Sequence, residues 1–132
     1  MLAWIKSLFT GDKLDGPLAR RGENLAARFI AGLGYKILAR NYRSAVGEID
    51  IVARDRDTLV FVEVKTRADD DPRPEDQVNR GKQHRLTRAA KSYLARYGSP
   101  PPGARFDVVA IVWADGKEPV IRHTQHAFEA TF

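Results

Sequence analysis

Apolar residues recur along the chain with two spacings, which predict the segments that form helices and strands. Residues 17–34 carry apolar positions three and four apart, the spacing of a helix that buries one face. Pro17 is well placed to open this helix, and two glycines near its end stop it. A second helical stretch covers about residues 77–97 and is broken by glycines and prolines at 98–103. The apolar face of this second helix is formed by Leu86, Ala89, Ala90, Tyr93, Leu94 and Tyr97.

Shorter apolar stretches predict five β-strands, at residues 35–42, 47–53, 58–66, 106–113 and 120–123. The polar residues 54–57 predict a turn between the second and third strands. Asp115-Gly116 predicts a hairpin between the last two. The order is therefore helix, three strands, helix, two strands, which is typical of an α/β domain with a mixed sheet.

The third predicted strand, TLVFVEVKT at residues 58–66, combines a core pattern with charges. Alternation places Glu63 and Lys65 on the face of Phe61, and three valines on the other. A strand with apolar residues on both faces is central in its sheet. The charges near its end therefore lie at the sheet rim, where sites of α/β domains form.

The preceding strand supplies a second carboxylate. If Ala53 pairs with Thr58 across the predicted turn, Asp50 lies on the same face as Glu63, and Glu48 lies opposite Glu63. Two carboxylates about 4 Å apart repel by about 4 kcal/mol at an effective dielectric constant near 20. Such a cluster needs a cation.

Magnesium is a cation of the right chemistry, because it takes one or two carboxylates and adds water and phosphate oxygens. The chain has no cysteine, so any metal must be bound by oxygen or imidazole. Lys65 would position the attacking water or neutralise the transition state. Glu23, on the flank of the first helix, could complete the site. The alternative is a salt-bridge cluster at a strand end, with Glu23 an ordinary boundary residue.

These residues also resemble a known motif. Asp50 with Glu63-Val64-Lys65 resembles the PD-(D/E)XK nuclease signature, and Arg21-Gly22-Glu23 resembles its helical glutamate. The chain is similar to the YraN-type family of small endonuclease-like proteins, whose fold is similar to archaeal Holliday junction resolvases. The segments that carry this likeness span residues 20 to 112: RRGENLAARF, GYKILARNYR, GEIDIVARD, LVFVEVKTR, LTRAAKSYL and RFDVVAI.

The resemblance implies a restriction-endonuclease-like three-layer α/β domain, with a central mixed β-sheet flanked by helices. It implies Asp50, Glu63 and Lys65 as catalytic residues, and Glu23, Asp50 and Glu63 as ligands of Mg²⁺ or Mn²⁺. Ile49 stands where the signature has proline. We expect one such domain at residues 16–132 after an N-terminal extension at 1–15, and a homodimer by analogy with the resolvases.

Basic residues gather in one part of the chain. Lys and Arg number 22 against 17 Asp and Glu, giving a formal charge of +5, and residues 77–106 contain no acidic residue. Such a local excess favours a polyanion such as DNA; the alternative is a solvated helix face. The candidate nucleic-acid-binding residues are Lys82, Arg85, Arg88 and Arg96.

Three functions fit these observations. The first is a metal-dependent endonuclease acting on DNA, branched or structured. The second is a nucleic-acid-binding module that keeps the fold without cutting, and the third is a protein–protein interaction module. The apolar runs are too short to span a bilayer, and we expect a cytoplasmic protein. Asp107, beside Arg105 at the start of a strand, is expected to form a structural ion pair or a cap and to have no catalytic role.

Overall fold

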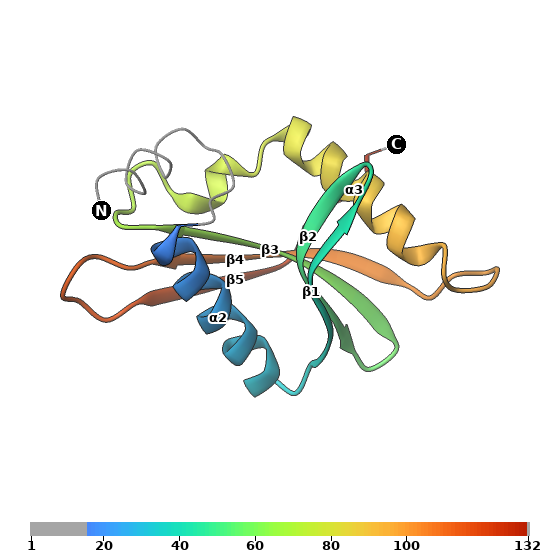
Figure 1. The fold of residues 1–132 in the computed structure, drawn as a ribbon, viewed down its shortest axis with the longest axis horizontal. Helices are drawn as coiled ribbons and strands as arrows, with labels where there is room; N and C mark the ends of the chain where they lie inside the picture. The colour runs from blue at the N-terminus through green and yellow to red at the C-terminus, as the bar shows by residue number, and fades with distance from the viewer. Residues whose placement is uncertain (1–15, 132) are drawn as a thin grey trace.

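The computed structural model describes residues 16–131, and the predicted N-terminal extension lies outside them. A five-stranded sheet has one α-helix on each side (Figure 1). The predicted order of helices and strands is confirmed, with a short 3₁₀-helix in addition. The elements are α2 (Pro17–Gly32), β1 (Lys36–Ser44), β2 (Gly47–Asp55), β3 (Thr58–Arg67), η1 (Pro74–Gln77), α3 (Arg80–Leu94), β4 (Ala104–Val112) and β5 (Val120–Phe128).

The sheet is mixed and its strands are neighbours in chain order. β1, β2 and β3 form an antiparallel meander, β3 and β4 are parallel, and β5 returns antiparallel to β4. A parallel pair needs a long crossover connection, and α3 lies in that connection. The predicted α/β class with a central mixed sheet is therefore confirmed.

The sheet separates two hydrophobic cores. Val60, Val62 and Val64 of β3 pack with Ala26 and Ile30 of α2 on one side. Leu59 and Phe61 of β3 lie in the other core, with the buried stripe of α3. The predicted alternation of β3 is thus confirmed, and helix, sheet and helix make three layers. The buried residues that α3 supplies are Leu86, Ala89, Ala90 and Tyr93.

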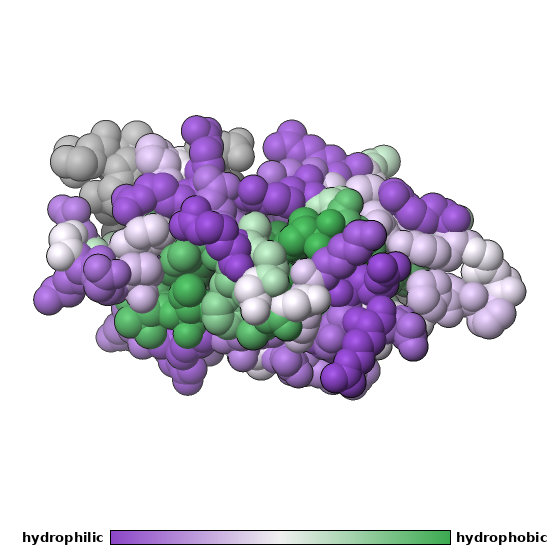
Figure 2. Space-filling view, turned by 90° about the horizontal axis from the view of Figure 1, so that it is seen from below, coloured by the Kyte–Doolittle hydropathy of each residue, from purple (hydrophilic) through white to green (hydrophobic). Residues whose placement is uncertain are grey.

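The α2 side of the molecule also carries apolar surface. Phe29, Ile37 and Ile121 are only partly buried against this core, and Leu33, the residue that follows α2, is exposed. Figure 2, which looks at the molecule from below Figure 1, shows a hydrophobic region on this face with polar residues around it. No helix within residues 16–131 is long and apolar enough to cross a membrane.

The turn between β2 and β3 is tighter than predicted. Asp55 pairs with Thr58, so the turn has two residues, Arg56 and Asp57, and Arg56 takes a positive φ of 56°. The predicted pairing of Ala53 with Thr58 was wrong, because β2 continues two residues further, to Asp55, while β3 begins at Thr58 as predicted. The error is two residues, and an even shift keeps the paired residues of β2 and β3 on their predicted faces.

The start of α3 also differs from the prediction. The helix begins at Arg80 instead of about Gln77, because the Asn79 side chain caps it by accepting from the Lys82 N–H at 3.0 Å. Residues 74–77 form the separate 3₁₀-helix η1. The cap fixes the position of Lys82 in the first turn of α3.

Helix α2 crosses β3 in close contact at Gly22. A methyl group at this position would overlap the Thr66 hydroxyl. Gly22→Ala should therefore lower the free energy of unfolding by about 1–3 kcal/mol, since either the helix or Thr66 must move. Chemical denaturation measures this change. Gly32→Ala is the control, because no atom lies within 4 Å of its added methyl group; an equal loss there would contradict the close contact.

Candidate active site

Asp50 lies where β2 and β3 separate. The last paired residues are Ile51 and Val62, and Asp50 and Glu63 are the next residues beyond this pair. Asp50 is 1% exposed, and its Oδ2 accepts a hydrogen bond from the Val64 N–H at 2.8 Å. A side-chain carboxylate is therefore fixed against β3 near the point where pairing between these two strands ends.

Glu63 and Lys65 extend from β3 on the side of α3, and both are buried. Lys82, in the first turn of α3, places its Nζ 3.0 Å from Glu63 Oε2, with 14% of the Lys82 side chain exposed. Lys65 interacts with the charges of Lys82, Glu63 and Asp50. Two carboxylates and two ammonium groups thus form one buried cluster, which we call the charge cluster: Asp50, Glu63, Lys65 and Lys82.

The charge cluster changes the acidity of Lys65. Burial, followed by the nearby Lys82 charge, lowers the Lys65 pKa from 10.5 to about 8, although Glu63 and Asp50 act in the opposite direction. Lys65 therefore changes charge close to neutral pH, where an ordinary lysine stays protonated. Residues with such shifts are common at functional sites.

Glu23 is placed differently from the other predicted ligands. It is half-buried on α2, which packs against the valine face of β3 and not against the face of Glu63. Among residues 16–131, no group of three or more aspartate, glutamate or histidine side chains is arranged to hold one metal ion. The structure brings Asp50, Glu63 and Lys65 together without Glu23 as a third carboxylate.

The charge cluster has the chemistry of a divalent-cation site. It offers two buried carboxylates from neighbouring strands, and Mg²⁺ takes one or two protein carboxylates and completes its shell with water and phosphate oxygens. The donor set therefore fits Mg²⁺ or Mn²⁺. The Lys82 ammonium, however, already contacts one Glu63 oxygen.

The predicted nucleic-acid-binding residues divide into two groups. Arg85 and Arg88 are exposed on α3. Lys82 instead turns inward to Glu63, which sequence reasoning missed, since Lys82 lies among basic residues in the chain. Arg96 is exposed, but its guanidinium lies 3.8 Å from the centre of the Tyr93 ring and its Nε donates to the Tyr93 carbonyl.

A second polar network holds β4 and β5 together. Arg105 donates to Asp107 at 3.0 Å, as predicted, and also contacts Asp55 and the Tyr35 hydroxyl. His123 bonds the other Asp107 oxygen at 2.7 Å, a contact that was not predicted from the sequence. Burial alone would raise the Asp107 pKa, but these hydrogen bonds outweigh it and lower the pKa. The network is a structural ion-pair cluster.

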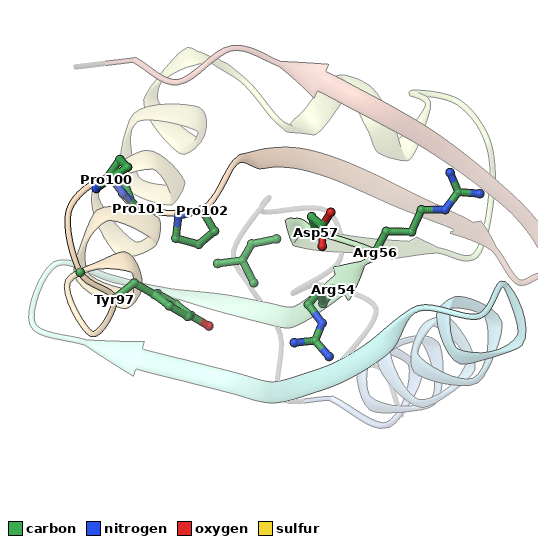
Figure 3. A pocket seen from close by; sticks show the side chains of 9 residues that line it. Arg54, Arg56, Asp57, Tyr97, Pro100, Pro101 and Pro102 are labelled. Carbon is green, nitrogen blue, oxygen red and sulfur yellow. The ribbon is translucent and has the colours of Figure 1, made fainter.

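A surface cleft of about 720 Å³ lies at the opposite end of β3. The β2–β3 turn forms one wall, with Arg54 and Arg56, and the loop after α3 forms the other, with Tyr97 and prolines 100–102 (Figure 3). Leu59, the second residue of β3, also lines the cleft. The cleft contains no residue of the charge cluster.

The fold and the site define a three-layer α/β domain with a buried cluster of carboxylates and lysines on its central strands. The family model "Uncharacterised protein family UPF0102" matches residues 22–111, and the chain belongs to this family. It is 50% identical over 99 residues to a UPF0102 protein of Chlorobium phaeobacteroides, covering 74% of this chain and 79% of that protein. It is 48% identical over 110 residues to one of Symbiobacterium thermophilum, with coverages of 83% and 93%.

The acidity of Lys65 can be measured directly. The Lys65 Nζ of the metal-free protein should titrate at about pH 8 in side-chain NMR, with Lys65→Arg used to assign the signal. Lys82→Met should raise this pKa, because it removes a neighbouring positive charge, while burial keeps it below 10.5. A Lys65 pKa near 10.5 in the unaltered protein would contradict the buried charge cluster.

Proposed function

We propose that this protein is a metal-dependent endonuclease that acts on DNA. The observation that supports this most is the burial of Asp50, Glu63 and Lys65 together, where β2 and β3 separate. An ordinary strand-end ion pair is exposed and contributes little to stability. Charges buried on a central strand cost free energy of desolvation, and this favours a functional role over the salt-bridge alternative.

In this proposal, Asp50 and Glu63 hold Mg²⁺ or Mn²⁺. When bound, such an ion activates water and stabilises charge on a phosphate. The hydrogen bond from the Val64 N–H orients the Asp50 carboxylate. Lys65, beside both carboxylates, holds the attacking water or donates to a phosphate oxygen.

The basic face of α3 gives the proposal its substrate class. Arg85 and Arg88 are exposed on the helix whose first turn carries Lys82. A phosphate backbone that follows this helix would therefore arrive at the charge cluster. By analogy with the resolvases that the sequence resembles, we propose branched or structured DNA as substrate and a homodimer as the active assembly.

A non-catalytic nucleic-acid-binding module is the second candidate. Within residues 16–131 there is no three-carboxylate metal group, and Lys82 already neutralises Glu63. A protein that only binds DNA would keep such a cluster as a structural ion pair. Cleavage and binding measurements separate the two functions.

Glu63→Gln and Lys65→Ala should each reduce cleavage at least about 100-fold, because one removes a metal ligand and the other a cation beside the reacting phosphate. The assay uses linear, single-stranded, flapped and four-way DNA in Mg²⁺ or Mn²⁺. Glu48→Gln is the matched control, since Glu48 lies on β2 in an exposed pair with Arg43. Cleavage at full rate in Glu63→Gln would place the activity elsewhere, and absence of cleavage in the unaltered protein on every substrate would favour the binding module.

Arg85→Ala and Arg88→Ala should each weaken duplex binding and reduce the slope of log affinity against log salt by about 0.9, because each contact neutralises one phosphate. Binding is measured by fluorescence anisotropy across a salt series. Arg28→Ala, on the exposed face of α2, is the control and should change neither quantity. If the α3 variants behave like Arg28→Ala, the helix face is only solvated.

A further inference from the structure

Most of the Lys82 side chain is shielded from solvent, although neighbouring residues of α3 are exposed. Its neighbours Gly81 and Arg85 on α3 are exposed, yet the Lys82 side chain is only 14% exposed and its Nζ contacts Glu63 Oε2. Lysine is seldom buried to this extent unless it is paired. The direction of this side chain is therefore determined by the Glu63 carboxylate.

The charges of the cluster show what Lys82 does there. Asp50 and Glu63 contribute two negative charges, and Lys65 and Lys82 contribute two positive charges, so the cluster is neutral with protonated lysines. If a divalent cation bound while all four charged side chains stayed in place, the buried cluster would have a net charge of +2. The same cation in place of Lys82 would leave +1, which costs less desolvation free energy.

The backbone of Lys82 can stay in place while its side chain leaves. Asn79 holds the Lys82 N–H as the cap of α3. The four-carbon stem of lysine is flexible and its ammonium is a compact charge without fixed geometry. Arg85 is exposed one turn further along the helix. An outward-facing Lys82 would thus extend the basic face of α3.

We infer that Lys82 is a tethered counter-ion of Glu63, which a divalent cation displaces so that its ammonium moves to a nucleic-acid phosphate. This inference rests on the proposed function and adds the control of its metal site. Lys82 is then a positioning residue. Because the same ammonium leaves the metal site and reaches the phosphate, metal and nucleic acid each strengthen the binding of the other, by equal factors.

Direct measurement of Mn²⁺ binding to the full chain, by calorimetry and by the electron paramagnetic resonance of free Mn²⁺, tests this inference without any cleavage assay. Lys82→Met keeps the apolar stem and removes the charge, so it should bind Mn²⁺ at least about 10-fold more tightly than the unaltered protein. Lys82→Gln should also bind Mn²⁺ at least about 10-fold more tightly, and it replaces Lys82→Met in the test if that variant does not fold. Lys82→Arg keeps the charge and should stay within about 3-fold. Lys117→Met, in the exposed β4–β5 turn, is the matched control.

The second measurement is the coupling between metal and DNA. A short duplex should tighten Mn²⁺ binding to the unaltered protein, and this increase should disappear in Lys82→Met. Unchanged or weaker Mn²⁺ binding in folded Lys82→Met and Lys82→Gln would overturn the inference and leave the nuclease proposal standing if the unaltered protein cleaves DNA. If neither the unaltered protein nor these variants bind Mn²⁺ at millimolar concentration, the metal site and the inference are both wrong.

Discussion

The contact between Lys82 and Glu63 is the interaction on which the candidate site depends. β3 is buried on both faces, so a carboxylate in its middle needs a nearby positive charge, and α3 provides one at 3.0 Å. A buried ion pair seldom stabilises a fold more than apolar residues of the same size would. Its presence is therefore better explained by a requirement for charges at this place, which agrees with a site that exchanges one cation for another.

Topology brings these charges together. The parallel pairing of β3 and β4 requires a crossover, and this crossover carries α3 over the sheet face of Glu63. Arg122 of β5 donates hydrogen bonds to Asp70 and Glu75, which lie in the segment between β3 and α3. The hydrogen bond from Arg122 to Glu75 lowers the Glu75 pKa to about 2. This segment, the cap at Asn79 and the separation of β2 from β3 together fix the geometry of the cluster.

The two polar networks of the protein have different roles. The Asp107 network links strands through several hydrogen bonds, which makes it suited to hold the sheet. The charge cluster instead depends on two lysines, one of which has a pKa lowered to about 8. The chain belongs to the UPF0102 family, and the chemistry of the charge cluster is what supports the proposed nuclease.

The sequence by itself determined the order of elements and the two faces of β3, because these follow from local periodicity. It also placed Asp50 near Glu63 on the neighbouring strand, since a two-residue register error leaves them close together. Only the tertiary structure decided the two-residue turn, the start of α3 at its asparagine cap, and the packing of α2 on the valine face of β3. It also decided the direction of Lys82. Sequence places this lysine among basic residues of an exposed helix, whereas its partner lies 19 positions earlier on another element. The choice between solvent and Glu63 depends on packing between α3 and the sheet, which no local pattern contains.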